Sequence, residues 1–279
     1  MLSDVVELLR CPVCRGSLEL GDGALRCGDG HSFDVARQGY VSLFAGGGRA
    51  GEVDTPEMVE ARAAFLSAGH FRLLSAALTE AAAQVDLDGA IFDVGGGTGH
   101  HLAAVLDSLP QRRGVVVDAS SAALRRAARS HPRAAAIGAD AWRPLPIADR
   151  VAALVMSVFA PRNAAEMARI LARGGALLAV TPTTRHLYEL VGPLGLLSVP
   201  DDKEDRLDAQ LASQFALAER HTIEHAMFLA RDEAAQIVRM GPSAWHVDEQ
   251  ALDERLAELP DPLTVTASMT LSRYVRGRT

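Results

Sequence analysis

Apolar and polar positions along most of the chain follow two alternating patterns. Runs of consecutive apolar residues, typical of strands buried on both faces, are followed by stretches with apolar residues every three or four positions, typical of amphipathic helices. The expected strands cover residues 90–94, 114–119, 134–140, 151–158 and 175–182. The expected helices cover residues 100–109, 121–130, 164–172 and 186–191. This alternation predicts an α/β fold in which helices cover both faces of a Rossmann-like parallel sheet.

Two other patterns flank this alternation. Residues 54–84 carry apolar residues at helical spacing, with Thr55 and Pro56 at the positions of a helix cap and first turn. Near the C-terminus, residues 215–229 and 264–275 alternate with a period of two, which predicts antiparallel edge strands.

The first 45 residues differ from the rest of the chain. They are rich in turn formers, Cys and His, and they are too short to fold on an apolar core alone, so a bound metal would have to stabilise them. We therefore expect an N-terminal module at residues 1–45, a linker and helical connector at 46–88 that begins in a glycine run, and an α/β domain at 89–279.

The composition narrows the class of protein. Of the 279 residues, 48% are hydrophobic, which is enough for a folded core. We expect a soluble, cytoplasmic protein without membrane contact, because the sequence shows no signal peptide and no run of roughly 20 apolar residues. The net charge of -7 argues against a protein that coats nucleic acid nonspecifically. A local basic patch is still allowed, and it would consist of arginine because Lys203 is the only lysine.

All three cysteines lie in the N-terminal module, together with a histidine. Two residues separate Cys11 from Cys14, and three separate Cys27 from His31. Two such pairs supply the four ligands of a structural zinc site and leave no open position for catalysis. The alternative is a set of buried cysteines beside a surface histidine. We expect zinc to hold a loop surface that carries Arg10, Arg15, Arg26 and Arg37.

A glycine-rich segment follows the first expected strand of the α/β domain. Its candidate cofactor-binding residues are Asp93, Gly95, Gly97, Thr98, Gly99 and His100. A phosphate-binding loop would need Lys and Ser or Thr after the glycines, where this chain has His100 and His101. A dinucleotide-binding loop would need Gly or Ala at position 100, so an NAD site is disfavoured but not eliminated. The acidic-x-G-x-G-x-G loop of methyltransferases fits every position.

Two acidic residues follow the next two expected strands. Asp118 can accept hydrogen bonds from both ribose hydroxyls of an adenosine, or alternatively cap the helix that begins near Ser120. Asp140 is placed to meet the adenine amino group. Because open parallel sheets bind ligands at the carboxyl ends of their strands, the glycine loop and both aspartates should meet at one site.

Other candidates are weaker when judged by residue type. His186 lies near the start of an expected helix, and Phe71 lies in the connector, where both residue types are more often structural. Ser243 lacks one flanking glycine of a nucleophile elbow, because Trp245 stands where the second glycine is needed, so a serine hydrolase is unsupported.

Several segments of the sequence, taken together, resemble one known protein family. They are residues 11–14, 30–43, 54–71, 93–103, 157–163, 181–191 and 240–246. In combination they resemble the bacterial 23S rRNA (guanine-N1)-methyltransferases of the RlmA type, and most of all the actinomycete branch that confers resistance to tylosin and related macrolides. The resemblance implies a zinc ribbon joined to a class I S-adenosylmethionine (SAM) methyltransferase domain. It also implies methyl transfer to N1 of a guanine in hairpin 35 of 23S rRNA, guanine 748 in the resistance branch.

The resemblance implies site residues as well. Cofactor contacts would fall on Phe71, Gly97, Thr98 and His186. Phe71 stands where relatives often have Tyr, so any hydrogen bond from that hydroxyl is lost. Gly96 and Thr98 replace the Cys and Glu of the enterobacterial branch, which favours the resistance-type assignment. A homodimer is a candidate assembly for this protein.

Methyl transfer from a sulfonium requires alignment of sulfur, methyl and acceptor nitrogen, and exclusion of water. We predict that residues 159–163 frame the target base, with Arg162 or Asn163 touching its edge, and that Trp245 either stacks on a nucleotide or packs in the core. Two other functions fit the residues. One is a small-molecule methyltransferase with a structural zinc, and the other is an inactive RNA-binding relative that keeps the cofactor pocket.

Overall fold

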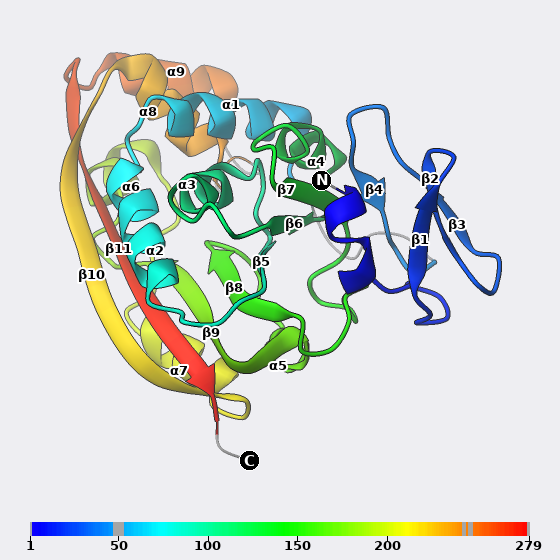
Figure 1. Ribbon diagram of the computed structural model, residues 1–279. Helices are drawn as coiled ribbons and strands as arrows, with labels where there is room; N and C mark the ends of the chain where they lie inside the picture. The colour runs from blue at the N-terminus through cyan, green and yellow to red at the C-terminus, as the bar shows by residue number, and fades with distance from the viewer. Residues whose placement is uncertain (1, 47–52, 242–243, 245–247, 278–279) are drawn as a thin grey trace.

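The computed structural model describes residues 2–46, 53–241, 244 and 248–277. Its centre is an eight-stranded sheet with the strand order β10-β11-β9-β8-β5-β6-β7-β4 (Figure 1). Strands β4 to β9 pair in parallel, which confirms the predicted α/β fold. They are β4 (Val41–Ser42), β5 (Ala90–Val94), β6 (Gly114–Asp118), β7 (Ala134–Gly138), β8 (Ala152–Val158) and β9 (Leu171–Pro182).

The two C-terminal strands form a long antiparallel hairpin. β10 (Phe215–Leu229) pairs with β11 (Leu263–Arg276) along its whole length, and β11 also pairs antiparallel with β9. The predicted antiparallel strands are therefore confirmed, but only β10 lies at the edge of the sheet. β11 is inserted between β9 and β10 and is buried over most of its length, because both of its faces are covered.

Helices pack on both faces of the sheet. One face carries α1 (Pro56–Ser67), α2 (Arg72–Ala83), α3 (His100–Ser108), α4 (Ser121–Ala127), α6 (Tyr188–Leu194), α8 (Arg231–Arg239) and α9 (Glu249–Ala257). The other face carries α5 (Ala164–Ile170), α7 (Lys203–Leu211) and the N-terminal module. Val116 points to the first face, whereas Val115 and Val117 point to the second, as the period of a strand requires.

The connector is helical, as predicted. Thr55 Oγ1 accepts a hydrogen bond from the Met58 backbone N–H at 3.2 Å, and Pro56 occupies the first helical position of α1. A turn then leads into α2, so the segment forms two helices rather than one.

The N-terminal module is built around a small antiparallel sheet. After the short 3-10 helices η1 (Leu2–Asp4) and η2 (Val6–Leu8), the strands are β1 (Leu18–Gly21), β2 (Ala24–Cys27) and β3 (Ser32–Asp34). Leu25 of this module shares an apolar cluster with Phe92 of the large sheet. β4 follows within the first 45 residues yet pairs with β7, so the module and the α/β domain are joined by a common sheet as well as a common core.

Candidate cofactor and metal sites

The predicted metal ligands come together in the N-terminal module. The ligand atoms of Cys11, Cys14, Cys27 and His31 all lie within 4.8 Å of one another. Cys14 Sγ is 3.6 Å from Cys27 Sγ, which is 3.3 Å from His31 Nδ1. Zinc–sulfur bonds of about 2.3 Å in a tetrahedron place sulfur atoms roughly 3.8 Å apart, so this donor set fits a zinc ion with Nδ1 as the histidine ligand.

A cavity of about 300 Å³ opens at the carboxyl ends of β5, β6 and β7. Its lining includes eight predicted residues, namely Phe71, Asp93, Gly95, Gly97, Thr98, His100, Asp118 and Asp140. Gly99 and His186 lie beside it rather than in its lining. The structure therefore brings the glycine loop and both strand-end aspartates to one site, at the edge where parallel sheets bind ligands.

The glycine loop connects β5 to α3, and it packs too tightly for side chains. Gly95 has a φ of +74°, and a Cβ there would lie 2.5 Å from Ala160 Cβ. Gly99 has a φ of +76° and immediately precedes α3, where a Cβ would lie 2.7 Å from Ser130 Oγ. Both positions combine a left-handed backbone with a close neighbour, which only glycine satisfies.

Asp93 is a buried acid at the floor of this site. Its side chain is 1% exposed, and its Oδ1 has no hydrogen-bond partner among the described residues. Burial, and secondarily the charge of Asp118, raise the pKa of Asp93 to about 7. A buried acceptor that lines a cavity and lacks a donor indicates that a ligand supplies one.

Asp118 is held by the backbone around it. One carboxylate oxygen accepts from the Gly97 N–H at 2.9 Å, and the other accepts from the Ser120 N–H at 2.8 Å. The N-cap of α4 is Ser120, whose hydroxyl accepts a hydrogen bond from the Ala123 N–H. Asp118 is therefore not the cap of this helix. Each oxygen keeps a free lone pair for a ribose hydroxyl.

Asp140 resembles Asp93 in having one unused acceptor. Its Oδ1 accepts from the Trp142 N–H at 2.9 Å, while its buried Oδ2 has no hydrogen-bond partner in the described part of the chain. Arg143 lies 3.6 Å from that oxygen, within ion-pair range. An adenine amino group has the donor that this oxygen lacks.

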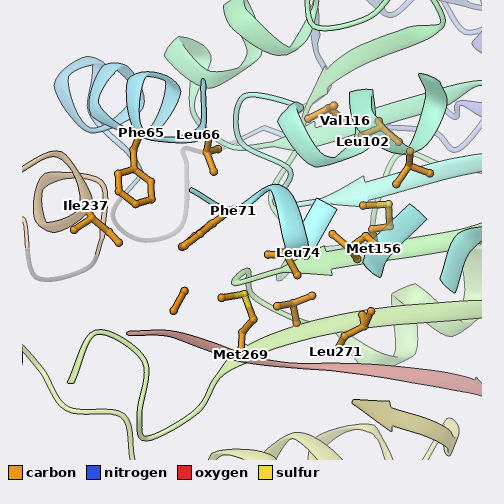
Figure 2. Packing of buried hydrophobic residues seen from close by; sticks show 14 of the residues in the cluster. Phe65, Leu66, Phe71, Leu74, Leu102, Val116, Met156, Ile237, Met269 and Leu271 are labelled. Carbon is orange, nitrogen blue, oxygen red and sulfur yellow. The ribbon is translucent and has the colours of Figure 1, made fainter. Parts of the chain in front are cut away.

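Phe71 is both a core residue and a cavity residue. Its ring is 2% exposed and lies between Leu66 of α1 and Met269 of β11 (Figure 2). It also lines the cavity, and its centroid is 6.1 Å from those of Phe159 and His186.

His186 is fixed in one neutral form. Its Nδ1 accepts a hydrogen bond from the Ser268 N–H at 3.2 Å, so the ring proton resides on Nε2. Burial, and secondarily the neighbouring His225, lower the pKa of His186 to about 4. His186 stacks on Phe159 with a centroid distance of 5.8 Å and an interplanar angle of 25°.

Arg162 and Asn163 lie outside the cavity lining. The Arg162 guanidinium donates to Val180 O at 2.8 Å, and Asn163 caps α5 by accepting from the Glu166 N–H at 3.3 Å. The cavity is instead lined by the three residues before them, Phe159, Ala160 and Pro161. Trp245 and Ser243 fall outside the described residues.

Part of the cavity lining was not predicted from the sequence. Arg62 of α1 forms an ion pair with Asp54 and donates to Met240 O at 2.8 Å, which closes one wall with residues far apart in the chain. His101 faces the cavity from the first turn of α3 and contacts Ser75 Oγ at 2.9 Å. Burial, and secondarily His100, lower the pKa of His101 to about 3, so the ring is neutral.

The zinc module is anchored to the α/β domain by an arginine expected on an open surface. Arg15 donates to Leu145 O at 2.6 Å and Ile147 O at 3.2 Å, and Leu9 forms a β-bridge with Ile147. Arg15 is exposed like Arg26, but unlike Arg26 it also joins the module to the α/β domain through its guanidinium.

These features define a class I SAM-dependent methyltransferase with an N-terminal zinc ribbon. They are the α/β fold, the glycine loop, the two strand-end aspartates and the cluster of three cysteines and a histidine. Two family models agree: the RlmA N-terminal zinc ribbon matches residues 9–45, and a methyltransferase domain matches residues 91–175. The chain belongs to the family of 23S rRNA (guanine-N1)-methyltransferases. It is an enzyme of that family, with SAM as methyl donor and zinc in its ribbon.

Full-length relatives establish this membership. The chain is 47% identical to the 23S rRNA (guanine(748)-N(1))-methyltransferase of Streptomyces fradiae over 275 residues, which cover 98% of both chains. It is 48% identical to a Micromonospora griseorubida protein provisionally named a 23S rRNA (guanine-N(1)-)-methyltransferase, over 98% of this chain and 99% of that one.

A solved structure supports the fold independently. It comes from the complex between the Haloferax volcanii Trm112 methyltransferase activator and a provisionally named methyltransferase. The similarity has a TM-score of 0.51 and 18% identity, and it covers 82% of this chain and 100% of that chain. In the described part of this chain, no helix is both long and apolar enough to cross a membrane.

Proposed function

We propose that this enzyme transfers a methyl group from SAM to N1 of guanine 748 in hairpin 35 of 23S rRNA, and that the modification confers resistance to tylosin-type macrolides. The observation that carries the proposal is the 47% identity, over 98% of both chains, with an enzyme named for that nucleotide. The cavity adds support, because its acidic residues keep hydrogen-bond acceptor capacity that matches the donor groups of an adenosyl cofactor.

The cofactor would lie across the glycine loop. Asp118 would hold the ribose hydroxyls, and Asp140 Oδ2 would accept from the adenine amino group. Asp93 would accept from the cofactor's ammonium group through its unpaired Oδ1. The remaining contacts would come from the loop and from the aromatic wall, at Phe71, Gly95, Gly97, Thr98, Gly99, His100 and His186.

When bound, SAM supplies an activated methyl group, so the protein mainly positions the acceptor and excludes water. Arg162 and Asn163 would act by holding the segment that frames the base. Arg162 is tied to β9 and Asn163 to the start of α5 and to Trp142 O, at 3.3 Å. Replacing both with Ala should abolish methyl transfer while leaving cofactor affinity intact, and unchanged turnover would refute this role.

Finer features of organisation belong to the same proposal. The zinc ribbon at residues 1–45 would contact the rRNA, the connector would span residues 46–88, and the methyltransferase domain would span residues 89–279. We place the enzyme in the cytoplasm, where ribosomal RNA is modified. The exposed edge of β10 offers a surface for a homodimer, which light scattering of the zinc-loaded protein would detect.

Primer extension tests the proposed function. A 23S rRNA fragment containing hairpin 35 is incubated with the protein and SAM, and reverse transcription should stop next to guanine 748, because a methyl on N1 blocks base pairing. A fragment with adenine at that position is the control. A small-molecule methyltransferase would give no RNA product, and an inactive relative would bind the fragment without transferring a methyl group.

A further inference from the structure

One aromatic residue at the cavity has a combination of features that folding alone does not explain. Phe159 lines the cavity, yet its side chain is 41% exposed. Its backbone has a φ of +52°, in the left-handed region that a bulky side chain rarely adopts. Neither exposure nor this backbone conformation stabilises the protein, which is typical of a residue retained for function.

The surrounding structure forces Phe159 into this position. Val180 O of β9 accepts hydrogen bonds from the Phe159 N–H at 3.2 Å and from the Arg162 guanidinium at 2.8 Å. Both ends of the turn at residues 159–162 are therefore bonded to one carbonyl. Gln210 of α7 donates to Arg162 O at 2.6 Å. On its other side the turn presses against the glycine loop, where Ala160 occupies the space that a Cβ of Gly95 would need.

Two aromatic side chains pack against the Phe159 ring, and 41% of the residue stays exposed. His186 stacks on it nearly parallel, at 5.8 Å and 25°, and Phe71 lies 6.1 Å away at 47°. His186 is itself held by the Ser268 N–H and stays uncharged. The result is a rigid aromatic stack whose exposed member faces the cavity in which the methyl donor would bind.

We propose that Phe159 is the platform on which the target guanine stacks, and that Arg162 is a positioning residue that aims this ring. The inference rests on the proposed function and assigns it a specific contact. Enzymes that modify a base take it out of its helix and hold it by stacking on aromatic side chains. A flat ring at the mouth of the cavity, pre-oriented by the strained turn, suits a purine that must present its N1 edge to the methyl group.

The test uses four substitutions at one position in the zinc-loaded protein. Phe159→Leu keeps the apolar volume but removes the ring, and Phe159→Gly removes both the ring and the backbone strain. Phe159→Tyr and Phe159→Trp keep an aromatic face. Phe228→Leu is the matched control, because Phe228 is 69% exposed on β10 and does not line the cavity.

Stacking of a base on an aromatic side chain typically contributes a factor of roughly 10 to 100. We expect Phe159→Leu and Phe159→Gly to lower kcat/KM for the hairpin 35 fragment by about that factor, with the affinity for S-adenosylhomocysteine unchanged in calorimetry. The aromatic variants and Phe228→Leu should keep most of the activity. Phe159→Gly also relieves the positive φ, which offsets part of the packing on His186 and Phe71 that is lost with the ring. Each variant should keep a Tm well above the assay temperature, so that its loss of activity would not reflect unfolding.

Arg162 provides a second, independent measurement. If Arg162 acts only by aiming the ring, Arg162→Ala combined with Phe159→Leu should be no slower than the slower of the two single variants. Full activity of Phe159→Leu would overturn the proposal, and so would a matching loss of S-adenosylhomocysteine affinity, which would assign the ring to the cofactor. Failure of the unmodified protein to stop primer extension would instead refute the proposed function itself.

Discussion

Replacing the buried acid at the floor of the cavity should make the protein more stable and less able to bind its cofactor. Asp93 is 1% exposed, and burial raises its pKa from 3.8 to about 7. The shift of about three units corresponds to roughly 4 kcal/mol at about 1.4 kcal/mol per unit, which the folded state loses when the carboxylate is ionised in both states. Asp93→Asn keeps the shape of the side chain and removes the ionisation.

The direction of the pH dependence follows from which state holds the proton. Below about pH 4, both the folded and the unfolded chain keep Asp93 protonated, so it contributes nothing. Between about pH 4 and pH 7 the folded chain keeps the proton and the unfolded chain has lost it, so stability falls as pH rises. Above about pH 7 both states have lost the proton, so the reduction in the free energy of unfolding stays constant. The free energy of unfolding of Asp93→Asn minus that of the unmodified protein should therefore increase by up to about 1.4 kcal/mol per pH unit across this window.

Urea unfolding of both zinc-loaded proteins at about pH 5, 6, 7 and 8 measures this difference. The amide introduces donors of its own, but their contribution is independent of pH, so only the slope is diagnostic. Zinc-ligand protonation affects both proteins equally and cancels. Parallel stability curves would refute a raised pKa at Asp93. Calorimetry should also show at least 10-fold weaker S-adenosylhomocysteine binding by Asp93→Asn, because the acceptor proposed for the ammonium group loses its charge.

Two further substitutions have matched controls. Gly95→Ala should lower the free energy of unfolding by about 2 to 4 kcal/mol and abolish S-adenosylhomocysteine binding in calorimetry, because its Cβ would clash with Ala160. Gly174 has a similar positive φ but open space around it, so Gly174→Ala should lower the free energy of unfolding by about 1 kcal/mol and leave binding intact. Arg15→Ala should lower the free energy of unfolding by about 1 to 2 kcal/mol, because it removes two charged hydrogen bonds of a solvent-exposed side chain at the ribbon interface, and it should weaken S-adenosylhomocysteine binding. Arg26→Ala should do neither, and equal unfolding curves for the two arginine variants would contradict the anchoring role. Removal of zinc by a chelator should weaken S-adenosylhomocysteine binding in the same direction as Arg15→Ala.

The sequence could predict those parts of the site that depend on local periodicity. Asp118 and Asp140 follow short apolar runs that are typical of buried strands, so their meeting at one edge follows from the rule that parallel strands end together. The wall formed by Arg62 was not predictable, because it depends on a contact with Met240, 178 positions away in the chain. The exposure of Phe159 was likewise hidden, since an apolar residue after an apolar strand indicates core packing until its backbone conformation is known.

The same limit applies to the link between the zinc ribbon and the α/β domain, because the spacing of the cysteines indicates a bound ion but not which residues contact the other domain. Arg15 leaves the metal-binding turn directly after Cys14, and its N–H donates to Cys11 O at 2.9 Å, so the metal fixes where its guanidinium points. That guanidinium donates hydrogen bonds to the carbonyl oxygens of Leu145 and Ile147, at the far end of the loop that begins with Asp140. Because Arg15 contacts one end of this loop and the other end lines the cavity, we expect zinc in the ribbon to help hold Asp140, the carboxylate proposed to accept from the adenine.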